Sequence, residues 1–123
     1  MSTISPIITY RDVRAAIDFL CDAFGFERHA VHEGEDGELQ HVELRLGDDV
    51  IMPAPLRFGE TGHASLYVVV DDADAHHARA KAAGAEITME LSDKDYGSRD
   101  YAAKDLEGNA WYFGTYRPLS GEG

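Results

Sequence analysis

The strongest constraint on the fold is an internal repeat, because the second half of the chain follows the same order of predicted elements as the first. In each half, an apolar, β-branched segment comes before a segment with the pattern of a helix, and three strand-like segments follow. Gly25 and Gly84 end the two predicted helices, and Gly47 and Gly108 lie in turns at matching places further along. The sequence therefore predicts two βαβββ repeats, which is an α+β fold.

Hydrophobic spacing and composition place the individual elements. In the first predicted helix, apolar residues such as Val13, Ile17, Leu20 and Phe24 recur at the spacing of one helical face. The second predicted helix is rich in alanine. We predict helices at 12–23 and 71–83. Strands are predicted at 6–10, 26–32, 41–46 and 50–52 in the first repeat and at 65–70, 86–91, 99–104 and 110–116 in the second.

A length of 123 residues is typical of one compact domain. We expect a single domain over 1–123, with repeat one at about 4–53, a linker at 54–62 and repeat two at about 63–117. A four-stranded sheet with one helix leaves its second face open, so two such units form a mixed sheet that bears a cleft. That cleft is the expected binding site.

Charge and cysteine content limit the partners and the compartment. The chain has 11 Lys and Arg against 23 Asp and Glu, a net charge of −12 that repels nucleic acids and anionic membranes and attracts cations. No apolar run approaches the roughly 20 residues that span a bilayer. Cys21 is the single cysteine, and the N-terminal residues lack the pattern of a secretion signal. We expect a cytoplasmic protein that binds neither nucleic acid nor membranes.

Two segments carry a resemblance to a known superfamily. Residues 6–26 combine a strand, Arg11-Asp12 and a helix that ends in Phe24-Gly25-Phe26. Residues 96–109 run from Tyr96-Gly97 to the turn Asp105-Leu106-Glu107-Gly108-Asn109. With the βαβββ repeats, these segments resemble the vicinal oxygen chelate superfamily of glyoxalase, bleomycin-resistance and dioxygenase-like proteins, and they look closest to the bleomycin-resistance proteins. Leu106 stands where those proteins usually have proline, and Ser98 is an insertion relative to them.

The resemblance also implies where metal-dependent relatives place their ligands. These positions, near the start of the first strand and on the last strand of each repeat, fall near Ser5, Ser65, Ile51 and Tyr112. Hydroxyls, an alkyl chain and a phenol do not form a divalent metal site, which needs several imidazole or carboxylate donors. We therefore expect no metal and no cofactor, unless the strand near Ser65 starts early enough to bring His63 onto its face.

Aromatic residues on the predicted cleft face are the main binding candidates. On the last strand, Trp111 and Phe113 share one face and Tyr112 takes the other. The resemblance puts Tyr112 in the cleft and the other two beneath a helix. Tyr67 is in phase with Ser65 on the neighbouring strand, so both are expected to face the cleft. There Tyr67 either stacks on a planar group or packs on the surface of the sheet.

Two further candidates lie elsewhere in the chain. Tyr96 stands where the resemblance implies an aromatic residue that helps to hold the drug in bleomycin-resistance proteins. His41 alternates with Glu43 and Arg45 on one face of a strand, a face that either lines the cleft or is solvated. The expected ligand-binding residues are thus Tyr96, Tyr67, Tyr112, His41 and Ser65, and no residue is singled out as catalytic.

The remaining histidines are not expected to form a site. His29 and His32 are three residues apart, so on a regular strand they point to opposite faces. His76 and His77 are adjacent on a predicted helix, where they point about 100° apart, and they are expected to be surface or helix-face residues.

Two functions from different classes follow from these observations. The first is a metal-independent small-molecule-binding protein of the glyoxalase/bleomycin-resistance type, which sequesters a cationic or planar antibiotic in a dimer cleft. The alternative is a metal-dependent superfamily enzyme (lyase, isomerase or thiol transferase) or another enzyme that modifies a small molecule of unknown identity. The missing metal ligands favour binding over catalysis, and the resemblance implies a homodimer.

Overall fold

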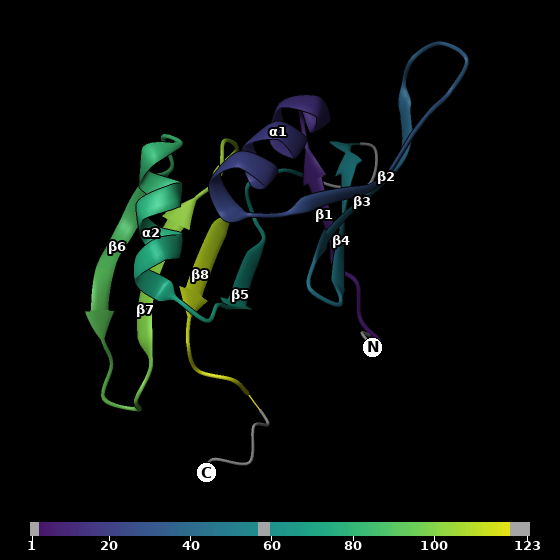
Figure 1. The fold of residues 1–123 in the computed structure, drawn as a ribbon. Coiled ribbons are helices and arrows are strands. Elements are labelled where there is room, and N and C mark those ends of the chain that lie inside the picture. Colours follow the sequence, from purple (N-terminus) through teal and green to yellow (C-terminus); the bar gives the residue numbers. More distant parts are fainter. Residues whose placement is uncertain (1–2, 57–59, 119–123) are drawn as a thin grey trace.

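The structure, a computed structural model, describes residues 3–56 and 60–118, and its elements follow the predicted order twice (Figure 1). The first unit contains β1 (Ile7–Tyr10), α1 (Val13–Phe24), β2 (Glu27–Glu33), β3 (Leu39–Leu46) and β4 (Asp49–Pro55). The second unit contains β5 (Ser65–Val69), α2 (Ala73–Ala82), β6 (Glu86–Asp93), β7 (Arg99–Lys104) and β8 (Ala110–Gly114). The α+β fold with two βαβββ repeats is therefore confirmed.

Each unit forms one mixed four-stranded sheet. The strand orders are β1-β4-β3-β2 and β5-β8-β7-β6. The first and last strands of each unit run parallel, with Ile7 opposite Met52 and Tyr67 opposite Tyr112, and the other neighbours run antiparallel. In the described part of the chain, β1 and β5 are therefore edge strands with one hydrogen-bonded neighbour each.

Helix α1 forms where the sequence predicts it because its apolar residues share one face. The carboxylate of Asp12 accepts a hydrogen bond from the Ala15 amide, so Asp12 caps the N-terminus of the helix. Gly25 follows the last turn at φ +85°, a left-handed conformation that favours glycine. The buried residues of α1 are Val13, Ala16, Ile17, Leu20, Cys21, Ala23 and Phe24.

The two units share one hydrophobic core. Helices α1 and α2 pack against each other, and each also contacts strands of its own sheet (Figure 1). Phe24 of α1 contacts two rings of the last strand, with centroids 4.7 Å from Phe113 and 5.5 Å from Trp111. The face of each sheet that its helix does not cover is called here the open face.

Side chains of α2 bind the C-terminal end of α1 across the two units. Arg79 donates from Nε to the carbonyl of Asp22 and from Nη2 to that of Cys21, both at 3.0 Å. Nε2 of His76 lies 2.9 Å from the carbonyl oxygen of Phe24. These contacts satisfy carbonyls that a helix end leaves without an intrahelical partner. His76 was expected to be a surface or helix-face residue, and tertiary packing places it half-buried on the face of α2 that meets α1.

The turn after β7, which carried part of the resemblance, is a second connection between the units. The Asp105 carboxylate is buried and accepts a hydrogen bond from the Tyr10 hydroxyl of β1 at 2.6 Å. The Glu107 carboxylate accepts hydrogen bonds from the amides of Arg11 and Asp12 at 2.6 and 2.8 Å. Partial burial acts to raise the pKa of Glu107, but these bonds and one from the Thr61 hydroxyl outweigh it and lower that pKa. The turn thus has a structural role.

Some predicted boundaries shift in the structure. Strand β4 continues to Pro55, so the first unit extends into the expected linker. Helix α2 begins at Ala73 because Asp72 serves as its N-cap. Residues 57–59 of the expected linker lie outside the described residues. Neither of the described helices is long and apolar enough to cross a membrane.

Candidate functional site

Two tyrosines lie side by side on the open face of the second sheet. Tyr67 on β5 is the register partner of Tyr112 on β8, and Ala102 on β7 continues this row. Tyr67 and Tyr112 are 39% and 42% exposed, whereas Trp111 and Phe113 are fully buried. Alternation along β8 therefore predicted the orientation of its three aromatic residues correctly.

The neighbouring positions along the strands are exposed on one side of this row and occupied by a buried carboxylate on the other. On one side, Ser65 is exposed beside Ala110. On the other, Gly114 pairs with Asp100 of β7, whose side chain is buried. A Cβ at Gly114 would lie 1.9 Å from Oδ1 of Asp100 and 2.6 Å from the Tyr67 hydroxyl oxygen. The Asp100 carboxylate therefore lies over Gly114, beside the tyrosine row.

Tyr96 joins the site from the turn between β6 and β7. Its hydroxyl donates to Oδ2 of Asp100 at 2.6 Å, and this bond raises the pKa of Tyr96 to about 12. Its ring is 60% exposed and meets the ring of Tyr116 edge-on, with centroids 5.5 Å apart. The Tyr67 hydroxyl donates to the carbonyl of Tyr116 at 3.0 Å. The structure thus brings Tyr67 and Tyr96 together around Asp100.

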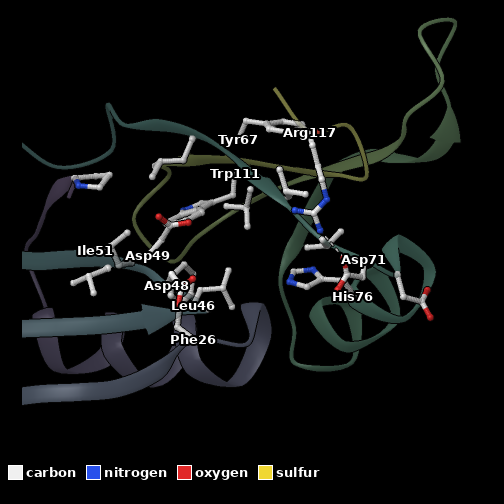
Figure 2. A pocket seen from close by; sticks show the side chains of 18 of the residues that line it. Phe26, Leu46, Asp48, Asp49, Ile51, Tyr67, Asp71, His76, Trp111 and Arg117 are labelled. Atoms are coloured by element: carbon white, nitrogen blue, oxygen red, sulfur yellow. Dashed lines mark hydrogen bonds and ion pairs between the residues drawn. The ribbon is translucent and has the colours of Figure 1, made fainter. Parts of the chain in front are cut away.

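A cavity of about 900 Å³ lies between the two units (Figure 2). Asp71 and Arg117 line this cavity and form an ion pair at 2.7 Å. Tyr67 lines it as well, so the cavity adjoins the tyrosine row. Its apolar lining, contributed by both units, includes Phe26, Leu46, Ile51, Leu66 and Trp111.

His41 lies on the open face of the first sheet. Within one chain it is therefore not part of the tyrosine row, which lies on the second sheet. It lines a smaller cavity of about 130 Å³ together with Ile7 and Met52. Nε2 of His41 is 2.6 Å from Oε2 of Glu43, and this hydrogen bond lowers the pKa of Glu43. His41 is therefore oriented by a carboxylate on its own strand.

A β-bulge overturns the prediction that His29 and His32 point to opposite faces. The register of β2 against β3 shifts around His29. As a result, Nε2 of His29 lies 3.8 Å from Oε1 of Glu43, while His32 stands opposite His41 with ring centroids 6.1 Å apart. These histidines gather around Glu43, which a sequence pattern that assumes a regular strand does not reveal.

Side chains at the metal positions implied by the resemblance do not fit a metal ion. Ile51 is buried in the core and lines the cavity between the units, so it does not lie on the open face of its sheet where the resemblance placed it. The residue of β4 that corresponds to Tyr112 is Met52. Met52 lies opposite Ile7 on β1, as Tyr112 lies opposite Tyr67 on β5. A thioether, a phenol and serine hydroxyls offer neither imidazole nor carboxylate to a divalent ion.

His63 does not add a ligand there. Strand β5 begins at Ser65, so His63 precedes the strand, and its Nε2 lies 3.2 Å from a carboxylate oxygen of Glu60. Across residues 3–56 and 60–118, no group of three or more His, Cys, Asp or Glu is arranged to hold a metal ion. The donor chemistry therefore gives no basis for a reaction step through a metal.

Sequence reasoning did not identify Asp100, Ser98 and Tyr116 as part of this site. Alternation from the core residue Tyr101 could have placed Asp100 on the open face. An aspartate on an open face is normally solvated, however, and only the tertiary structure shows that Tyr96 and Ser98 cover this one.

Comparisons with known proteins agree with this architecture. The chain is 32% identical over 124 residues to the Mycobacterium bovis protein Mb0911c, a match that covers 90% of this chain and 81% of the relative. The crystal structure of TioX from Micromonospora sp. ML1 superimposes with a TM-score of 0.83 at 32% identity and covers 95% of this chain and all of that chain. TnmS3, described as an antibiotic binding protein from Streptomyces sp. CB03234, shares the fold at a TM-score of 0.73 and 19% identity, with 91% and 94% of the two chains covered. A family model of the Glyoxalase/Bleomycin resistance protein/Dioxygenase superfamily matches residues 3–113, and the chain belongs to this superfamily.

Proposed function

We propose that this chain is a metal-independent, cytoplasmic small-molecule-binding protein that holds a planar or cationic compound on the open face of its second sheet. The observation that carries the proposal is the exposed row of Tyr67 and Tyr112 on adjacent strands. Tyrosine rings offer a large apolar surface and stack on planar groups at little entropic cost. The description of TnmS3 as an antibiotic binding protein supports a small molecule as the ligand.

Charge around the tyrosine row supports a cationic ligand. The chain carries a net charge of −12. Asp48, Asp49 and Asp71 line the cavity that adjoins Tyr67, and Arg117 is held there in an ion pair with Asp71. A surface of this kind attracts cations over several ångströms, and salt weakens the attraction.

A second copy of the chain is proposed to complete the site as a homodimer. Ile7 on edge strand β1 is 61% exposed, and Tyr67 and Tyr112 on the open face of the second sheet are 39% and 42% exposed. An apolar face of this kind is normally covered by a partner or a ligand. Light scattering is expected to give twice the chain mass of 13.5 kDa.

The function is tested by calorimetric titration of metal-free bleomycin and of a planar cation, acridine orange, into chelator-treated protein at low and high salt. We expect saturable binding of at least one compound, weakened by salt. Tyr67→Ala and Tyr112→Ala should each weaken it by about 1–3 kcal/mol, because each removes one ring of the platform. Leu106→Ala is the matched control, since Leu106 is exposed on the turn after β7, outside the tyrosine row.

Two results would contradict the proposal. Affinities that are unchanged in both tyrosine variants would place the ligand elsewhere, and no saturable binding of either compound would remove the proposed ligand class. Elemental analysis of protein purified without chelators addresses the metal separately. A stoichiometric divalent ion would contradict metal independence and favour the superfamily's metal-dependent chemistry.

A further inference from the structure

Two buried aspartates in the second unit differ in how well their carboxylates are satisfied. Asp105 is 7% exposed and accepts five hydrogen bonds, at distances from 2.6 to 3.1 Å. The donors are the Tyr10 hydroxyl, the Trp111 indole, the Asn109 side chain and the amides of Glu107 and Asn109. A carboxylate has about four lone-pair sites, so the bonds within the fold saturate Asp105.

Asp100 is buried to the same degree but has fewer partners. It is 5% exposed and accepts hydrogen bonds from two neutral hydroxyls, those of Tyr96 and Ser98, among the described residues. A buried carboxylate is normally paired with a cation or with several amides, because removing its charge from water is costly. Asp100 therefore keeps acceptor capacity that the described residues do not use.

The positively charged side chains near Asp100 are engaged elsewhere. Arg99, its neighbour in sequence, donates to both carboxylate oxygens of Asp74 at 3.0 Å and to Asp93 at 3.1 Å. These ion pairs hold the Arg99 guanidinium away from Asp100. Lys94 lies with Nζ 3.5 Å from the sulfur of Met89. Asp100 thus has no lysine or arginine partner within residues 3–56 and 60–118.

Tyrosine rings surround this carboxylate on the open face. Tyr96 donates to it, Tyr67 lies beside it over Gly114, and Tyr116 contacts the Tyr96 ring. The Ser98 hydroxyl fixes the arrangement, because it donates to Asp100 and accepts from the Tyr116 amide. Aromatic rings around a negative charge are the chemical setting that binds alkylated ammonium groups, through cation–π attraction and charge.

We propose that Asp100 is the counter-ion for a positively charged, alkylated nitrogen of the ligand, held among the rings of Tyr67, Tyr96 and Tyr116. This inference rests on the proposed function, because it concerns the same open face. It adds that the ligand carries a fixed or protonated positive nitrogen, in or beside the planar part that lies on the tyrosine row. The nitrogen reaches Asp100 by displacing the Tyr96 hydroxyl, whose side chain is 60% exposed, while the Tyr96 ring stays beside the cation.

The test uses two planar probes, N-methylacridinium and acridine, which differ by one methyl group and by a positive charge, titrated at a pH where acridine is neutral. Stacking on the tyrosine row predicts that both bind. A counter-ion at Asp100 predicts that the wild-type chain binds N-methylacridinium about tenfold or more tightly than acridine. Asp100→Asn keeps the shape and an acceptor oxygen but removes the charge, so it should remove most of this preference, measured as the ratio of the two affinities, and leave only the smaller part that the overall negative charge of the chain supplies.

A second variant keeps the test decisive if Asp100→Asn fails to fold. Tyr96→Phe keeps the ring and the carboxylate but removes the hydroxyl that competes with the cation, so the preference for N-methylacridinium over acridine should rise several-fold. No preference in the wild type, an undiminished preference in Asp100→Asn, or an unchanged preference in Tyr96→Phe would overturn the role of Asp100. Failure of both probes to bind the wild type would instead refute the proposed function on which this inference rests.

Discussion

Tyr10 illustrates how one polar atom in the core connects distant parts of the chain. The side chain is fully buried, and its hydroxyl donates to the Asp105 carboxylate of the other unit. Burial, reinforced by the Asp105 charge, raises the pKa of Tyr10, so the phenol stays protonated and remains a donor. Because Asp105 is itself buried, the bond is shielded from competing water.

At this scale we predict that Tyr10→Phe lowers the free energy of unfolding by about 1–3 kcal/mol, the usual contribution of a buried hydrogen bond to a charged group. Urea denaturation followed by Trp111 fluorescence measures the loss. Tyr112→Phe is the matched control, because the Tyr112 hydroxyl is on the open face, and it should change stability by no more than about 0.5 kcal/mol. Equal effects of the two substitutions would show that the bond to Asp105 contributes nothing.

At the scale of elements, carbonyl groups at the C-terminal end of α1 depend on a side chain of α2 for their hydrogen bonds. Gly25 turns the chain away in a left-handed conformation, and the Arg79 guanidinium lies against it while donating to two α1 carbonyls. A guanidinium suits this position because its planar fork reaches both carbonyls at once. The two helices are thus joined by polar contacts at the edge of their apolar interface.

We therefore predict that Arg79→Met destabilises the chain by about 1 kcal/mol, even though methionine keeps the apolar stem, because two hydrogen bonds across the units are lost. Arg79→Lys should not restore the loss fully, since an ammonium does not reproduce the fork. Lys81→Met on the same helix is the control and should leave the denaturation midpoint nearly unchanged. An unaltered midpoint in both methionine variants would mean that the two bonds do not stabilise the interface between units.

At the scale of the whole molecule, His76 makes the joint between the units sensitive to acid. Its Nδ1 is 2.5 Å from the Tyr101 hydroxyl oxygen and its Nε2 faces the Phe24 carbonyl. Nε2 therefore carries the proton, and the Tyr101 hydroxyl donates to Nδ1. Burial, with a smaller contribution from the Arg79 charge, lowers the pKa of His76 below its usual 6.5, although the bond to Phe24 opposes this.

A group that is harder to protonate in the folded state stabilises the fold only while it is neutral. Between the lowered pKa of His76 and 6.5, the unfolded chain binds more protons, so stability should fall as the pH drops below about 6.5. We predict this decline in urea denaturation midpoints between about pH 8 and pH 5, and a flatter profile for His76→Gln. His63→Gln, which alters an exposed histidine, should keep the wild-type profile. Parallel profiles for all three proteins would contradict the role of His76.

We also propose that the chain unfolds as one domain, because both units contribute to one core and the contacts of Asp105, Glu107, Arg79 and His76 join them. The same denaturation curves test this. Fluorescence and circular dichroism should report a single coincident transition.

The sequence predicted the repeat, both helices and all eight strands to within a few residues, since hydrophobic period and turn chemistry are local properties. Alternation separated Tyr112 from Trp111 and Phe113, and the resemblance to the superfamily implied that Tyr112 and Tyr67 face the open side, as the structure shows. The sequence prediction failed for His29 and Ile51. In the first case a bulge interrupts the alternation, and in the second the assumed register was displaced by one residue.

By itself, then, the sequence determined the order of elements, the faces they present and the acidic character of the molecule, because these depend on residue type and spacing along the chain. Only the tertiary structure decided which side chains from distant segments meet. The cover of Tyr96 and Ser98 over Asp100, the contact of His76 with α1 and the gathering of histidines around Glu43 all depend on how strands and helices pack. Such contacts join residues whose separation in sequence carries no periodic signal, and so no local pattern records them.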